Sequence, residues 1–77
     1  MDTARNIKIG DIVRRTLREQ GKTNSWFAEE LSINIRTVNK ILKKETIDTQ
    51  QLFKISKILQ TDFFKIYSEA LKEKILM

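Results

Sequence analysis

Residues 23–44 read TNSWFAEELSINIRTVNKILKK, and this stretch decides how the chain folds. Apolar residues recur at helical spacing on both sides of a break at residues 32–34, which predicts two short helices instead of one long helix. Thr23 and Asn34 each precede such a run and are typical N-cap residues, so the helices are expected to begin after them. The second helix is predicted over about residues 35–43. Helices this short are not stable alone, so flanking segments must pack against them.

The composition indicates a small folded protein. The chain has 77 residues, enough for one domain with one small core, and it is 40% hydrophobic and 32% charged. It contains no Cys and no His, which excludes disulfides, Cys/His zinc sites, thiol nucleophiles and histidine general bases. No apolar run approaches the length of a membrane span and no signal peptide is visible, so we expect a cytoplasmic protein without a membrane partner.

The flanking sequence predicts three further helices, which gives an all-α fold of five helices. The first is expected over about residues 7–20, with Asn6 as its cap and Gly21 as its left-handed end. The fourth is expected to begin at Asp48, because Gln51 follows three residues later in a capping-box arrangement. The buried faces of the first four helices are predicted to contain Ile9, Ile12, Val13, Leu17, Phe27, Ala28, Leu31, Val38, Ile41, Leu52, Ile55, Ile58 and Leu59.

The fifth helix is predicted over about residues 63–74, with Asp62 as its cap. This C-terminal segment is unusually apolar for one short helix on a small core. Its apolar residues are Phe63, Phe64, Ile66, Tyr67, Ala70, Leu71, Ile75 and Leu76. They either close the base of the core or form a dimer interface. We assign residues 1–77 to a single domain, with a flexible arm at 1–6 and a C-terminal extension or dimer segment at 72–77, and expect no effector-binding or catalytic domain after it.

The pair of helices at residues 23–44 has the features of two closely crossing helices with one exposed face. Ala28 supplies a small residue where the helices cross, and the turn needs a backbone-tolerant residue at Ser32. Val38 and Ile41, three residues apart, are predicted to fix the inner face of the second helix. The residues left on its outer side are Ile35, Arg36, Thr37, Asn39 and Lys40. The net charge of +5 is concentrated in this helix and the loop that follows, which favours a polyanion as partner.

In these motifs the chain resembles the Cro and phage-repressor-like helix-turn-helix family, also called the Xre family, over residues 9–67. The motifs are Ile9-Gly10, Gly21-x-Thr23, Phe27-Ala28-x-x-Leu31, Val38-x-x-Ile41 and Leu52…Ile55…Leu59. The resemblance implies a five-helix, lambda-repressor-like DNA-binding domain of a bacterial or phage-like transcriptional regulator. In that family the third helix enters the major groove of double-stranded DNA, usually in a homodimer on a two-fold operator.

The resemblance also implies roles for individual residues. Ile35, Arg36 and Lys40 match base-contacting positions, and Thr37 and Asn39 beside them reach bases or phosphates. The residues implied as phosphate contacts are Thr23, Asn24, Lys43 and Lys44. Arg14, Arg15 and Arg18, outside the motifs, are assigned to a solvated face of the first helix.

Three positions depart from the pattern of the family. Asn24 replaces the usual Gln, which shortens the reach to phosphate. Trp26 replaces a usually charged residue and either packs under the N-terminal arm or stacks near the DNA backbone. Leu17 and Leu42 occupy the positions of a frequent Arg–Glu ion pair, so we expect a hydrophobic contact there.

A second function class stays open beside DNA binding: a protein-interaction module that reuses the fold, such as an antitoxin or an adaptor. An enzyme is not expected, because the carboxylates are caps or solvated charges and no nucleophile–base pair is visible. We expect no cofactor, no metal and no small-molecule ligand.

Overall fold

The structure is a computed structural model that describes residues 7–76, the side chain of Leu76 excepted. The arm expected at residues 1–6, the cap expected at Asn6 and the last residue, Met77, lie outside the described residues. The described part is all-α and has no strand. Its five helices are α1 (Ile9–Glu19), α2 (Asn24–Leu31), α3 (Ile35–Ile41), α4 (Thr49–Leu59) and α5 (Phe64–Leu76).

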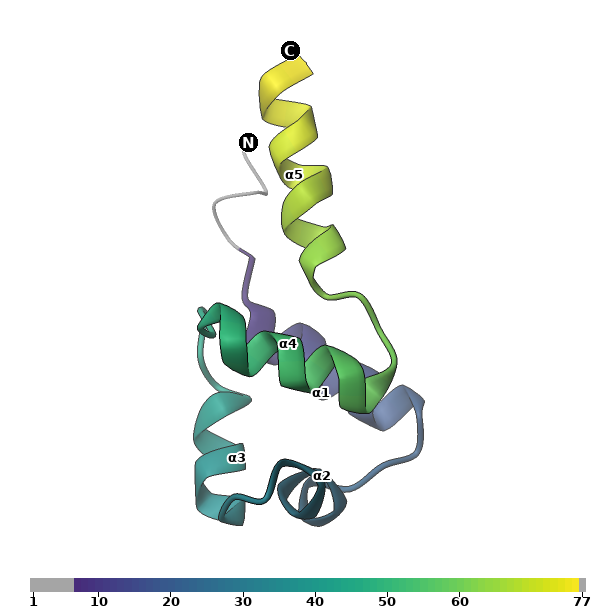
Figure 1. The fold of residues 1–77 in the computed structure, drawn as a ribbon, viewed down its shortest axis with the longest axis vertical. Helices are drawn as coiled ribbons and strands as arrows, with labels where there is room; N and C mark the ends of the chain where they lie inside the picture. Colours follow the sequence, from purple (N-terminus) through teal and green to yellow (C-terminus); the bar gives the residue numbers. More distant parts are fainter. Residues whose placement is uncertain (1–6, 77) are drawn as a thin grey trace.

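The first four helices form the body of the molecule, and α5 projects from it (Figure 1). In the view of Figure 1, α4 crosses in front of α1, while α2 and α3 lie at the other end of the body from α5. The projection of α5 makes the molecule elongated, with extents of 42 × 23 × 20 Å.

One hydrophobic cluster holds α1 to α4 together. Its buried residues are Ile9, Val13, Leu17, Phe27, Ala28, Val38, Ile41, Leu42, Leu52, Ile55, Leu59 and Phe63. The described part of the chain buries no polar or charged side chain in it. Three residues predicted to be core, Ile12, Leu31 and Ile58, are only half-buried and pack on the edge of the cluster. The burial of apolar side chains is therefore what stabilises the body.

Side-chain caps begin three of the helices where the sequence predicted them. The Thr23 hydroxyl accepts a hydrogen bond from the Trp26 amide at 3.0 Å, which confirms the start of α2. Asn34 Oδ1 accepts from the Arg36 amide at 2.8 Å at the start of α3. Asp48 Oδ1 accepts from the Gln51 amide, also at 2.8 Å. These bonds satisfy amides that have no partner within their own helix.

Three helices end in the same way, on a residue with left-handed backbone angles. Gly21, Ser32 and Gln60 have φ of 70°, 56° and 50° and follow α1, α2 and α4. In each case the next amide donates to a carbonyl five residues back, as in Lys22 N–H to Leu17 O at 2.9 Å. The left-handed end at Gly21 was predicted. The one at Gln60 was not, because glutamine carries no sequence signal for it.

The fifth helix begins one residue later than predicted, at Phe64. Asp62 Oδ1 accepts a hydrogen bond from the Lys65 amide at 3.2 Å, while Phe63 precedes the helix and is buried in the core. Tyr67, Leu71 and Ile75 are exposed, so they do not close the base of the core.

The start of α1 differs most from the prediction. The helix begins at Ile9 instead of residue 7, and its N-cap residue, Lys8, makes no side-chain capping bond. The first amides of the helix donate instead to the loop after α3. Gly10 N–H reaches Lys44 O at 3.0 Å, and Ile9 N–H reaches Glu45 O at 3.3 Å. A tertiary contact thus satisfies amides at the start of the helix that a side-chain cap would otherwise satisfy.

Gly10 allows this contact because it has no side chain. A Cβ atom at this position would lie 2.5 Å from Lys44 O and 2.8 Å from both Ile41 O and Leu42 O. These are backbone atoms, which cannot turn aside as a flexible side chain can. The start of α1 and the end of α3 are therefore locked together by a close backbone approach.

We expect Gly10→Ala to lower the free energy of unfolding by about 1–3 kcal/mol, because the methyl group overpacks against the backbone of residues 41–44. In a helix without this contact the same change would stabilise by roughly 0.5–1 kcal/mol. Urea unfolding followed by circular dichroism measures the difference.

Gly21→Ala is the control for the Gly10 variant, since nothing lies within 4 Å of the added Cβ atom and only the left-handed backbone is strained. A Gly10→Ala protein as stable as the wild type would show that the contact is unimportant.

Candidate nucleic-acid interface

The outer side of α3 presents five side chains to solvent. These are Ile35, Arg36, Thr37, Asn39 and Lys40, the residues predicted as base contacts, and all five are exposed. Val38 and Ile41 on the inner side are buried, as predicted. An α-helix with its side chains is about 10–12 Å across, which fits the width of the major groove of B-DNA.

Ile35 is the first residue of α3 and the least expected in an exposed row. Its side chain is 42% exposed, although leaving an isoleucine side chain in water is unfavourable. The Asn34 cap and the buried Val38 fix the start of the helix and hold Ile35 outward. An apolar group held in this way can contact a thymine methyl group.

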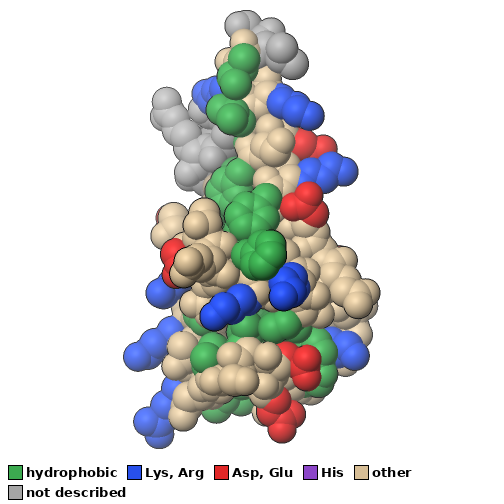
Figure 2. Space-filling view, viewed as in Figure 1, with side chains coloured by type: hydrophobic (Ala, Val, Ile, Leu, Met, Phe, Trp, Pro, Cys, Tyr) green, Lys and Arg blue, Asp and Glu red, His purple; other side chains and the backbone are tan. Residues whose placement is uncertain are grey.

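The charges of the molecule are separated between neighbouring helices. Residues 35–47 contain Arg36, Lys40, Lys43 and Lys44 against a single acidic residue, Glu45. The exposed side of α2 carries Glu29 and Glu30 instead. Figure 2 shows Lys and Arg side chains along the edge of the molecule where α3 lies, and Asp and Glu side chains over α2. A polyanion would therefore be attracted to the α3 side.

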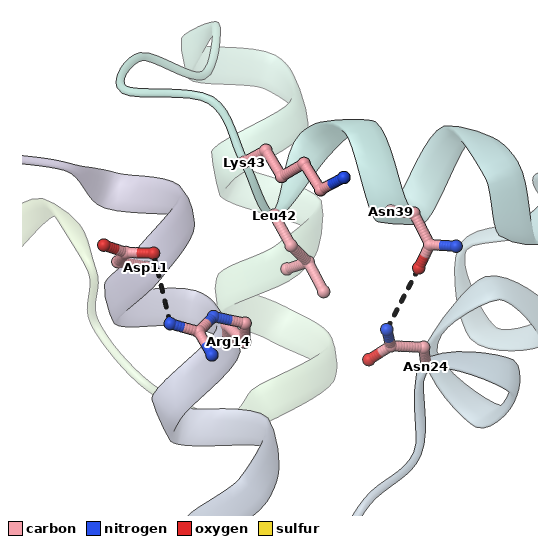
Figure 3. Close-up of a pocket in the computed structure, with 6 residues that line it drawn as sticks. All are labelled: Asp11, Arg14, Asn24, Asn39, Leu42 and Lys43. Atoms are coloured by element: carbon pink, nitrogen blue, oxygen red, sulfur yellow. Dashed lines mark hydrogen bonds and ion pairs between the residues drawn. The ribbon is translucent and has the colours of Figure 1, made fainter.

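A groove of about 380 Å³ lies beside α3, where α1, the start of α2 and the end of α3 meet. Asn24, Asn39 and Lys43 line it, together with Arg14, Asp11 and Leu42 (Figure 3). Asn24 Nδ2 donates a hydrogen bond to Asn39 Oδ1 at 3.1 Å, which ties the first turn of α2 to the outer side of α3. Two residues predicted to contact DNA separately are thus held to each other.

The other predicted phosphate contacts lie around this groove. Helix α3 ends at Ile41, not at about residue 43, so Lys43 and Lys44 both lie in the exposed loop after it. The carbonyl of Lys44 accepts a hydrogen bond from the Gly10 amide, which fixes the backbone of this loop against the start of α1. The Thr23 hydroxyl is exposed but already accepts from the Trp26 amide, and its O–H remains as a donor.

Arg14 is exposed, as expected for a solvated face of α1, and it also lines this groove. Its guanidinium lies 3.3 Å from Asp11 Oδ1 and lines the same groove as Lys43 and Asn24. No local sequence signal distinguishes it from Arg15 and Arg18. Only the docking of α1 against the end of α3 brings it here.

Leu17 and Leu42, which were expected to make a hydrophobic contact, are both buried in the core cluster. Leu17 is 1% and Leu42 is 3% exposed, and Leu42 points from the end of α3 toward α1 in Figure 3. The floor of the groove is therefore apolar, and its walls carry the polar groups.

Trp26 does not lie among the exposed residues of α3. Its half-buried ring packs against the core and lines a hollow with Gln20, Ile58 and Leu59, on the side of α2 next to α4. The Lys22 ammonium lies 4.9 Å from the ring centroid, which is cation–π distance. This position supports a packing role for Trp26 at the junction of three helices.

Comparison with family models, with curated proteins and with solved structures finds no significant match for this chain. Over the described residues, no helix is both long and apolar enough to cross a membrane. Within residues 7–76, no cluster of three or more His, Cys, Asp or Glu side chains could hold a metal ion.

We expect the Asn24–Asn39 hydrogen bond to contribute a coupling free energy of about 0.5–1 kcal/mol to folding. The measurement is a double-mutant cycle by urea unfolding with Asn24→Ala, Asn39→Ala and the double variant. The cycle cancels the gain in helix propensity that alanine brings at each site. Strictly additive effects would show that the two amides do not hold α2 and α3 together.

Proposed function

We propose that the α2–α3 pair is a helix-turn-helix of the lambda-repressor-like kind, and that the protein is a sequence-specific DNA-binding transcriptional regulator of the Xre type. Helix α3 enters the major groove, and two copies bind the two halves of a symmetric operator. The observation that carries this proposal is the exposed row on α3 beside a groove of phosphate-binding groups. Base-reading and phosphate-binding side chains then lie on one side of the molecule.

The division of labour follows from the chemistry of each side chain. The Arg36 guanidinium is exposed in the first turn of α3 and has the paired donors that match O6 and N7 of guanine. Lys40 is one turn further along the same side. Lys43, Lys44 and the Asn24 amide flank the helix and donate to phosphates, which sets the position of α3 in the groove.

Arg14 joins the phosphate contacts in this proposal. Its present partner, Asp11, is exposed, and an exposed ion pair contributes little free energy. A DNA phosphate entering the groove beside Lys43 can therefore replace the carboxylate at small cost.

A protein-interaction module, such as an antitoxin or an adaptor, is the second candidate. The apolar side chains exposed on α4 and α5 favour it, because such surfaces commonly bind proteins. Salt separates the two candidates. Duplex binding that weakens steeply as salt rises, with footprints of paired half-sites about one helical turn apart, supports the regulator. A protein partner retained at high salt, with no affinity for duplex, supports the module.

We expect Arg36→Ala and Lys43→Ala to weaken DNA binding in different ways. A binding selection from a random duplex library with the wild-type protein first supplies the operator. Arg36→Ala should then cost about 1–3 kcal/mol at one base pair and relax the preference there. Lys43→Ala should weaken all duplexes alike and reduce the salt slope by about 1.

Arg18→Ala is the matched control, since it removes an exposed cation in the last turn of α1, at the end away from the groove. If Arg36→Ala and Lys43→Ala changed binding to the operator and to random DNA by the same factor, the assigned roles would be wrong.

A further inference from the structure

The groove beside α3 contains one acidic side chain among its polar groups. Two cations, two carboxamides and one carboxylate line it: Arg14, Lys43, Asn24, Asn39 and Asp11. They come from α1, α2, α3 and the loop after α3, so only the folded chain brings them together. A phosphate needs hydrogen-bond donors and positive charge, and an ionised carboxylate supplies neither. Among the described residues that line the groove, Asp11 is therefore the one group that opposes an anion.

The hydrogen bond between the two carboxamides leaves donors available in the groove. Asn39 Oδ1 accepts from Asn24 Nδ2 at 3.1 Å. The bond uses an acceptor of Asn39 and one hydrogen of Asn24, so each amide nitrogen keeps hydrogen to donate. Reading an adenine with two hydrogen bonds would require the same oxygen of Asn39. Asn39 is therefore better suited to a phosphate than to a base edge.

The Asp11 carboxylate holds Arg14 at the edge of the groove. A guanidinium nitrogen of Arg14 lies 3.3 Å from Asp11 Oδ1. In Figure 3 the guanidinium points toward Asp11 and away from the Asn24–Asn39 pair. Both partners of the ion pair are a little less than half exposed, so the pair contributes little to stability. Its effect is to offset the positive charge that Arg14 brings to the groove.

We propose that the groove binds one phosphate group and that Asp11 competes with this phosphate for Arg14. When a phosphate enters, the guanidinium leaves Asp11 and donates to the phosphate oxygens instead. The phosphate gains from the exchange because Lys43 and the two amides donate to it as well. Asp11 thereby lowers the affinity of the site, so that bound DNA is released at lower salt.

This inference rests on the proposed function for the source of the phosphate, which is the DNA backbone. It names a regulating residue within the site, and a free phosphate ion tests the site without DNA.

Asp11 also has a simpler role from which competition must be separated. It lies in the first turn of α1, where a negative charge is favourable for the helix. That role alone predicts that Asp11→Asn lowers stability slightly and leaves phosphate binding unchanged. Competition predicts that the variant binds phosphate more tightly, and that the gain is largest while Arg14 is present.

Titration with inorganic phosphate, followed by proton–nitrogen NMR at constant ionic strength, tests the site. We expect the side-chain signals of Arg14, Asn24 and Asn39 to shift together with one dissociation constant. Asp11→Asn should lower this constant about two- to fivefold, the range of an exposed ion pair. Glu19→Gln is the matched control, because it removes the same charge from an exposed position at the other end of α1.

Duplex binding provides the second arm of the test. Asp11→Asn should tighten binding to the selected duplex by a similar factor and steepen the salt slope by up to about 0.9, since one more positive charge faces the DNA. The gain should shrink in an Arg14→Ala background, because a double-mutant cycle isolates the part that acts through Arg14. Urea unfolding of each variant measures the separate effect on stability.

Three results would overturn the inference: an Arg14 signal that phosphate does not shift, a gain no larger than that of Glu19→Gln, or an equal gain without Arg14. A phosphate site that behaves as expected in a protein that binds no selected duplex would overturn the proposed function alone. Selective duplex binding that Asp11→Asn leaves unchanged would overturn the competition alone.

Discussion

The close approach of α1 to the end of α3 is the contact on which the arrangement of the molecule depends. The amides of Ile9 and Gly10 donate to the carbonyls of Glu45 and Lys44, and the missing side chain of Gly10 lets the backbones meet. This contact positions α3 from its C-terminal end, while the Asn34 cap and the left-handed Ser32 position it from the start. The reading helix in our proposal is thus held at its end by backbone hydrogen bonds and at its start by the Asn34 side chain, and its outer side chains remain available.

The same contact builds the groove beside α3. Because α1 docks against residues 41–45, Arg14 comes to lie beside Lys43, and Leu42 closes the floor over the core. The Asn24–Asn39 hydrogen bond completes the other wall. Core packing and the polar surface are therefore linked through one short segment, the end of α3 and the loop after it.

The caps show what the sequence can predict and what it cannot. Thr23, Asn34 and Asp48 bond to amides two or three residues away, so their roles follow from local chemistry and the structure confirms them. The start of α1 was misplaced because its amides are satisfied by residues more than thirty positions away. Arg14 is exposed, as predicted, but its place beside the groove could not be predicted, because it depends on the docking of α1 against the end of α3. The exposed side of α3 was predictable, since Val38 and Ile41 fix the inner face, whereas the projection of α5 depends on the turn after Gln60 and has no sequence signal.

The apolar core has a consequence for how the protein responds to its surroundings. Within the described residues, no polar or charged residue belongs to the buried core, although the Ser56 hydroxyl oxygen on α4 is itself buried, and the charges lie on the outside. Ionic strength acts on exposed charges and hardly on apolar contacts, whose strength depends chiefly on temperature. Salt therefore weakens the charge interactions of the α3 side, whereas temperature changes the stability of the body that carries it. The stability of the body and the charge interactions of the α3 side therefore respond to different conditions.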